Sequence, residues 1–150
     1  MWQNVPRART RLCLLSQMSM TGPVPRNPTT PFFVATAVME TGAGLALLMT
    51  PTMVLALLLS GPVTNTHIAL GRLAGAALLS LGAACWWARA DARSAASRAL
   101  VVGMSVYNAA VIAIILTGSF GAPGRPILSA ATLVHGAMAA WCVSLLRSGR

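Results

Sequence analysis

Long apolar runs separated by short polar links dominate the pattern of this chain. The longest run extends from Phe32 to Ser60 and contains one ionisable residue, Glu40, and one proline, Pro51. A helix of about 20 apolar residues crosses the roughly 30 Å of membrane hydrocarbon, so this run is longer than one span needs. Because Thr50-Pro51 is a pairing typical of a helix start, we divide the run into a span at about 32–49 and a short interfacial helix at about 51–59.

Three further apolar runs predict spans at about 67–88, 99–117 and 127–146. The links between them are short and rich in turn-forming or charged residues, so consecutive spans are expected to be antiparallel neighbours. The predicted fold class is therefore all-α: an integral membrane four-helix bundle, antiparallel, formed by residues 31–147. Residues 1–30 carry four arginines and a series of prolines without a lasting helical or strand period, so we expect a disordered cytoplasmic segment there.

Composition agrees with a membrane protein. Of the 150 residues, 56% are hydrophobic and 9% are charged, whereas about a quarter of a soluble domain is charged. The formal net charge of +9 comes from eleven basic and two acidic residues, a balance that would suggest nucleic-acid binding in a soluble protein. Here the arginines fall between apolar runs and form no basic face with interleaved aromatic residues, so we exclude nucleic acid as a partner.

The distribution of arginines predicts the orientation of the chain. With the amino terminus inside, one arginine, Arg125, lies in an outer link, and Arg72 lies within a span. Because cytoplasmic links carry an excess of basic residues, this pattern predicts a multi-pass protein of the bacterial inner membrane with both termini cytoplasmic. The nine arginines on the cytoplasmic side are Arg7, Arg9, Arg11, Arg26, Arg89, Arg93, Arg98, Arg147 and Arg150.

Polar residues interrupt all four spans near the middle of the membrane. A rise of about 1.5 Å per residue places them within one or two turns of the midplane. A charge at this depth costs about 2.5 to 3.5 kcal/mol on insertion scales, so such residues usually face the bundle and find partners. We expect Glu40 to pair with Arg72, directly or through a water, with the other residues as hydrogen-bonding neighbours. The predicted cluster is Glu40, Arg72, Tyr107, Asn108 and His135.

Three roles are open for this cluster. It can fix the register of the helices without any chemistry, hold a ligand or lipid head group, or carry protons or electrons. Glu40 is the first candidate for proton exchange, because burial and a neighbouring arginine act on its charge in opposite directions.

Metal binding and hydrolase chemistry lack the residues they need. One intramembrane histidine and three cysteines without CxxC spacing predict no metal site. Cys85 and Cys142 lie near the same ends of their spans, where a contact is conceivable but two free apolar-facing thiols are expected. The chain has no Walker loop, GxSxG or HExxH motif, so no catalytic residue is assigned.

Several short motifs in the first two spans carry a resemblance to a known group of proteins. They are Glu40-Thr41-Gly42-Ala43-Gly44-Leu45, Thr50-Pro51, Gly71-Arg72-Leu73-Ala74-Gly75-Ala76-Ala77-Leu78, Gly82 and Trp86. With these motifs, the layout from residue 31 to 146 resembles the DoxX-like group of small bacterial four-span membrane proteins. The resemblance implies a four-helix bundle. Because some members look like membrane subunits of quinone-linked oxidoreductases, it also implies a quinone or redox partner, and it identifies no catalytic residue.

The sequence favours a non-enzymatic membrane protein, either a subunit or accessory of a larger membrane assembly or a binder of a lipid-like molecule. Its expected partners are the lipid bilayer and a membrane protein or a second copy of the chain. One alternative is a redox subunit with a quinone, the only cofactor suggested, beside the polar cluster. Another is a small transporter, which four spans without a detectable inverted repeat make weaker.

Overall fold

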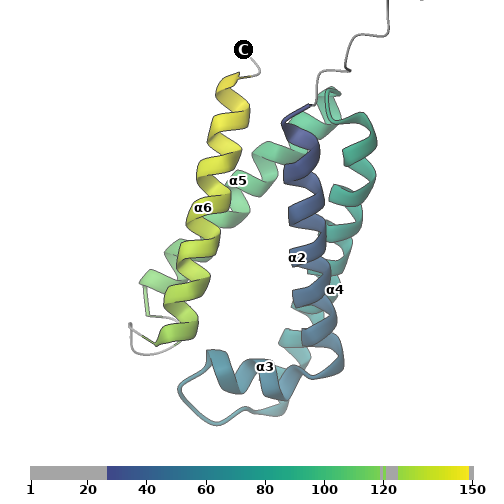
Figure 1. Ribbon diagram of the computed structural model, residues 1–150. Helices are drawn as coiled ribbons and strands as arrows, with labels where there is room; N and C mark the ends of the chain where they lie inside the picture. The colour runs from purple at the N-terminus through teal and green to yellow at the C-terminus, as the bar shows by residue number, and fades with distance from the viewer. Residues whose placement is uncertain (1–26, 119, 121–124, 149–150) are drawn as a thin grey trace, which may run out of the picture.

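The computed structural model describes residues 27–118, 120 and 125–148, and every regular element in these ranges is a helix. Figure 1 shows how the helices are arranged. They are α2 (Thr29–Met49), α3 (Pro51–Leu58), α4 (Asn65–Ala88), the short 3₁₀ helix η1 (Arg89–Asp91), α5 (Ala95–Leu116) and α6 (Pro126–Ser148).

Four of these helices are long and apolar enough to cross a membrane: α2, α4 together with η1, α5 and α6. This confirms the predicted all-α class with four candidate spans, and it identifies the chain as a multi-pass membrane protein. The short helix after the first span is also present as α3. It begins at Pro51, whose missing N–H is not needed in a first turn.

The helices begin a few residues earlier than the hydrophobic pattern predicts. α5 starts at Ala95 because Ser94 caps it, its Oγ accepting a hydrogen bond of 3.1 Å from the backbone N–H of Ser97. α2 starts at Thr29, so the expected disordered segment 1–30 is wrong for its last two residues, which are helical. Residues 1–26 of that segment lie outside the described residues.

The long helices form two antiparallel hairpins. α2 packs along α4, and α5 packs along α6. In the first hairpin the backbones approach closely at Gly44 and Gly75, where a Cβ atom built on either glycine would lie 2.7 or 2.8 Å from the carbonyl oxygen of the other. Small residues permit such an approach between membrane helices.

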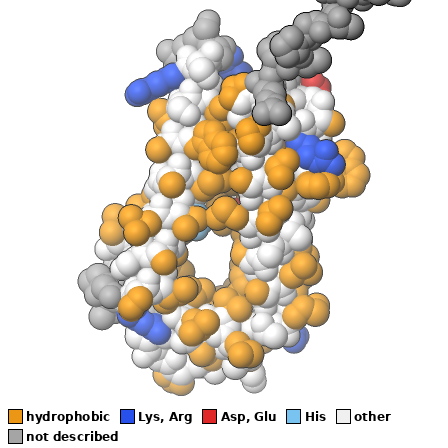
Figure 2. All heavy atoms as spheres, in the orientation of Figure 1, with side chains coloured by type: hydrophobic (Ala, Val, Ile, Leu, Met, Phe, Trp, Pro, Cys, Tyr) orange, Lys and Arg blue, Asp and Glu red, His pale blue; other side chains and the backbone are white. Residues whose placement is uncertain are grey.

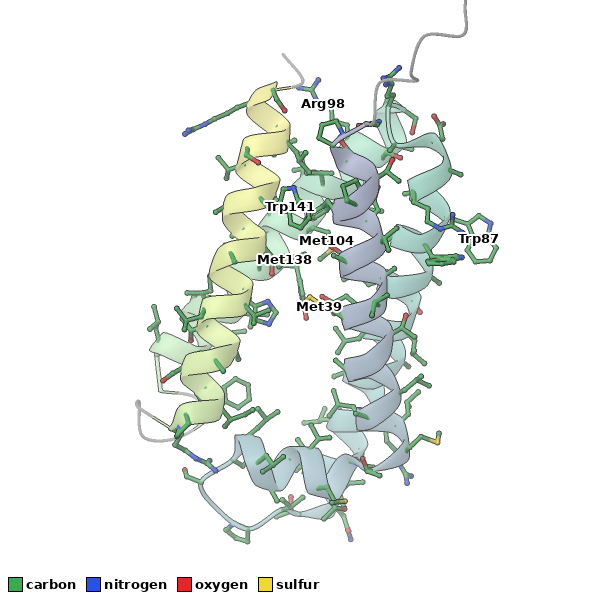
Figure 3. All side chains as sticks on the ribbon, viewed as in Figure 1. Met39, Trp87, Arg98, Met104, Met138 and Trp141 are labelled. Atoms are coloured by element: carbon green, nitrogen blue, oxygen red, sulfur yellow. The ribbon has the colours of Figure 1, made fainter. Side chains whose placement is uncertain are left out.

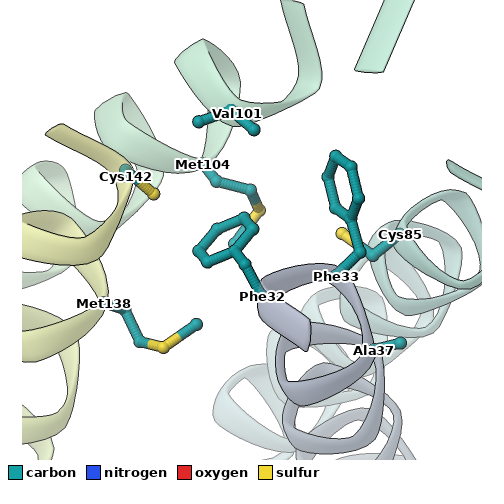
Figure 4. Packing of buried hydrophobic residues seen from close by; sticks show 8 residues of the cluster. All are labelled: Phe32, Phe33, Ala37, Cys85, Val101, Met104, Met138 and Cys142. Atoms are coloured by element: carbon teal, nitrogen blue, oxygen red, sulfur yellow. The ribbon is translucent and has the colours of Figure 1, made fainter. Parts of the chain in front are cut away.

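The two hairpins meet at one end in a hydrophobic core to which all four long helices contribute (Figure 4). Phe32 is fully buried there, and its ring packs edge-on against Trp141 of α6 with 5.6 Å between the ring centroids. The buried members of the core are Phe32, Phe33, Ala37, Cys85, Val101, Met104, Met138 and Cys142.

The hairpins are joined again at the opposite end, where α3 lies across the molecule. Arg125, just before α6, donates a hydrogen bond of 3.1 Å from Nη1 to the carbonyl oxygen of Leu58 at the end of α3. Between this contact and the core, Figure 2 shows an opening that passes between the two hairpins. The bundle is therefore packed at one end, bridged at the other and open in between.

Candidate functional site

A layer of polar side chains lies directly beside the hydrophobic core. It consists of Glu40 on α2, Tyr107 and Asn108 on α5, and His135 on α6, and we call it the polar layer. Its members lie three or four residues, about one helical turn, from a core residue of the same helix. All lie about 16 to 20 Å along their helices from the end of the bundle that holds the core. Both hairpins thus bring polar groups to one level near mid-membrane.

A hydrogen bond within the polar layer connects the two hairpins. The hydroxyl of Tyr107 donates to Glu40 Oε2 at 3.4 Å, and Glu40 is only 7% exposed. The Tyr107 ring also packs edge-on against the imidazole of His135, with 5.7 Å between the centroids. Tyr107 therefore contacts both the carboxyl group of one hairpin and the imidazole of its own hairpin.

Asn108 fixes the orientation of His135. Its Nδ2 donates to the carbonyl oxygen of Met104 at 2.7 Å, which leaves Oδ1 facing His135 Nδ1 at 2.8 Å. An amide oxygen can only accept, so Nδ1 of the imidazole carries the hydrogen. In neutral His135 the other ring nitrogen, Nε2, is then an acceptor.

The polar layer leaves acceptor atoms for a further group. Glu40 Oε1 has no hydrogen-bond partner within the described part of the chain, and Nε2 of neutral His135 is likewise an acceptor without one. Two donors of the layer are engaged within the protein, since the Tyr107 hydroxyl donates to Glu40 and the Asn108 amide nitrogen donates to Met104. Such an arrangement suits a molecule that donates hydrogen bonds, such as an alcohol or a phenol.

The predicted pairing of Glu40 with Arg72 is wrong. Arg72 is exposed, and among the residues described Glu40 has Tyr107 as its side-chain partner. The cause is the register of α2 against α4: Gly44 faces Gly75, which places Arg72 beside the end of α2. Glu40 and Arg72 are therefore separated by about 10 to 12 Å along the helix axes.

Thr36 is a buried polar residue close to the polar layer and is not part of the cluster predicted from the sequence. It is fully buried, and its hydroxyl has no hydrogen-bond partner in the residues that the structure describes. Most buried polar groups are hydrogen-bonded, so this hydroxyl is an exception. Its spacing of four residues from Glu40 is the sequence signal that places both on one face of α2.

No group of three or more His, Cys, Asp or Glu side chains is placed to hold a metal ion in the described ranges. Cys85 and Cys142 are buried free thiols in the hydrophobic core, which confirms the expectation of unbonded cysteines. The polar layer, by contrast, offers side chains at mid-membrane that can hydrogen-bond an organic ligand.

Fold and polar layer together define the class of this chain: a multi-pass α-helical membrane protein with a hydrogen-bonded polar layer between two helix hairpins. Comparisons of the chain with protein-family models, with curated proteins and with solved structures give no match.

Proposed function

We propose that this protein binds a lipid-like molecule in the opening between its two hairpins, with a hydroxyl head group against the polar layer. The observation that carries the proposal is the position of Glu40, a buried carboxyl group at mid-membrane with one oxygen bonded by Tyr107 and the other without a partner among the described residues. A polar group at this depth is costly unless it gains a partner, and a ligand hydroxyl provides one.

The walls beyond the polar layer support an apolar ligand body. At about 100° per residue, α2 continues toward α3 on the same side with Ala43, which is exposed. Met39 projects from α2 into the space between the hairpins in Figure 3. On α5 the next turn after Asn108 carries Val111 and Ile112, both half-buried. A molecule with one hydroxyl-bearing end and a hydrocarbon body matches this gradient from polar to apolar.

A quinol is the first ligand to test. Its phenolic hydroxyls are hydrogen-bond donors, and the resemblance to DoxX-like proteins suggests a quinone-linked role. In that case the protein acts as a membrane subunit or accessory of a redox assembly. The distribution of arginines supports placement in the bacterial inner membrane with both termini cytoplasmic.

The test is mass spectrometry of lipids and proteins that co-purify with the full chain from its native membrane in mild detergent. We expect one hydroxyl-bearing apolar molecule per chain in the wild type. Glu40→Leu should reduce its retention by about two- to tenfold, because a hydrogen bond is worth about 0.5 to 1.5 kcal/mol. Arg72→Gln is the matched control, since it alters a charge within a span but outside the polar layer.

The outcomes separate the competing roles. A retained quinol favours the redox role, and a co-purifying membrane protein favours the role of a subunit. If all three proteins carry the same bulk phospholipid and nothing else, the ligand proposal is wrong and the polar layer serves architecture. Helical content by circular dichroism shows whether Glu40→Leu still folds. If it does not, Tyr107→Phe replaces it.

A further inference from the structure

A groove runs along the outer side of the α2–α4 hairpin, away from the opening. Its first part has a volume of about 1060 Å³ and lies between the first turns of α2 and η1, where Pro31, Val34 and Arg89 are among its walls. A second hollow of about 620 Å³ follows further along α2, between α2 and α4, with Val38, Leu45 and Trp86 in its walls. Successive turns of α2 therefore supply one side of both hollows.

This groove is separate from the polar layer. At about 100° per residue, Val34, Val38 and Leu45 lie between about 120° and 160° around α2 from Glu40. Val38 is 64% exposed, whereas Glu40 is 7% exposed. The groove and the polar layer thus occupy opposite faces of the same helix.

Arginines line the η1 end of the groove. The guanidinium carbon of Arg89 lies 3.7 Å from the centroid of the Trp86 ring, so the ring covers one face of the planar group. Arg89 Nε is buried and has no hydrogen-bond partner in the described part of the chain. Arg93 lines the same hollow. When a guanidinium group stacks on an aromatic ring, its N–H groups point outward in the plane of the group. In this position they can donate hydrogen bonds to a phosphate.

The local backbone holds these arginines in place. Ser97 is buried, and its hydroxyl donates to the carbonyl oxygen of Asp91 at 2.7 Å, which ties η1 to the start of α5. Asp91 also lines the hollow, so its walls carry two arginines and one carboxylate. Glu40 and Asp91 are the only acids in the sequence. The chain therefore has no further acid to offer these arginines, and an outside anion is the complementary partner.

We propose that this groove binds an anionic phospholipid, with its phosphate at Arg89 and Arg93 and an acyl chain along Val34, Val38 and Leu45. The helix end is the level at which head groups meet a membrane protein, and Trp86 and Trp87 are the residue type that concentrates there. Figure 3 shows Trp87 projecting outward from α4 at this level. A basic site above an apolar groove matches an amphiphile with an anionic head.

The test is native mass spectrometry of the purified full chain titrated in detergent with phosphatidylglycerol or phosphatidylcholine. We expect the wild type to prefer phosphatidylglycerol. The double variant Arg89→Gln/Arg93→Gln should lose this preference by about 25-fold, taking roughly fivefold for each arginine near an anionic membrane lipid. Arg147→Gln, which removes an exposed arginine at the same end of the bundle but outside the groove, should bind as the wild type does.

Further variants test the two halves of the proposal separately. Val38→Trp fills the apolar hollow at an exposed position and should weaken phosphatidylglycerol binding while all arginines remain. Inorganic phosphate should not compete at millimolar concentration, because it lacks the acyl chain. Equal affinity for the two lipids, an equal loss in Arg147→Gln, or full displacement by phosphate would overturn the proposal.

Discussion

At the scale of single residues, Glu40 shows how a membrane protein accommodates an acid. It lies on the buried face of α2, with Phe33 and Ala37 before it and Gly44 after it. Its burial is offset by the hydroxyl of Tyr107, which comes from the other hairpin. The acid thus gains a partner through tertiary contact rather than from its own helix.

The hydrogen bond between Glu40 and Tyr107 should couple the two hairpins energetically. In a double-mutant cycle of Glu40→Leu and Tyr107→Phe, we expect a coupling free energy of about 0.5 to 1 kcal/mol, typical of hydrogen bonds between membrane helices. Unfolding in mixed micelles with increasing SDS measures it. The control cycle of Arg72→Gln with Tyr107→Phe should be additive. Additivity in both cycles would show that Glu40 and Tyr107 do not interact.

At the scale of elements, the α2–α4 hairpin depends on the absence of side chains where its helices touch. The hydrophobic pattern alone predicts two neighbouring helices, and the GxxxG pair Gly71 and Gly75 suggests close packing. The structure adds that Gly75 faces Gly44, while Gly71 faces Leu55 of α3. The two glycines of one motif therefore serve two different contacts.

Gly75→Ala should destabilise this hairpin. Its Cβ would lie 2.8 Å from the Gly44 carbonyl oxygen, so the helices must move apart, and overpacking typically costs about 1 to 3 kcal/mol. Gly42→Ala is the matched control, because a Cβ there meets nothing within 4 Å and alanine favours a helix by about 1 kcal/mol over glycine. The free energy of unfolding in mixed micelles measures both. A Gly75→Ala variant as stable as the wild type would contradict the close approach.

At the scale of the whole molecule, two hairpins give four candidate spans, and with an even number of spans the first begins and the last ends on the same side of the membrane. α2 begins, and α6 ends, at the same end of the bundle in Figure 1. The arginines Arg89, Arg93, Arg98 and Arg147 belong to this end as well. Because basic residues are in excess on the cytoplasmic side of membrane proteins, we expect this end to face the cytoplasm.

Alkaline phosphatase fusions test this orientation, since the enzyme is active only outside the cytoplasm. A fusion after Gly61, between α3 and α4, should be active, and a fusion after the carboxyl terminus should be inactive. Green fluorescent protein fused at the same two positions should give the opposite pattern. Activity of the carboxyl-terminal phosphatase fusion would show that the chain is inserted the other way round.

The sequence predicted most of the polar layer but not its pairing. Depth follows from counting residues along a helix, so Glu40, Tyr107, Asn108 and His135 were correctly placed at one level. Arg72 was grouped with them because its neighbouring helix and opposite charge suggested a pair. The rotation and register of one helix against another are set by packing at sites such as Gly44 and Gly75. Counting residues along a single helix gives the depth of a side chain but not this rotation or register.

The sequence by itself determined that this chain is suited to a membrane and which of its segments form helices. Runs of apolar residues long enough to cross a bilayer must form helices there, because each backbone polar group has to be satisfied within its own segment. Only the tertiary structure decided which polar groups meet and where the bundle stays open. These features depend on how two hairpins are joined, by the core around Phe32 at one end and by Arg125 and Leu58 at the other. Such contacts join residues far apart in the chain, so no local pattern encodes them.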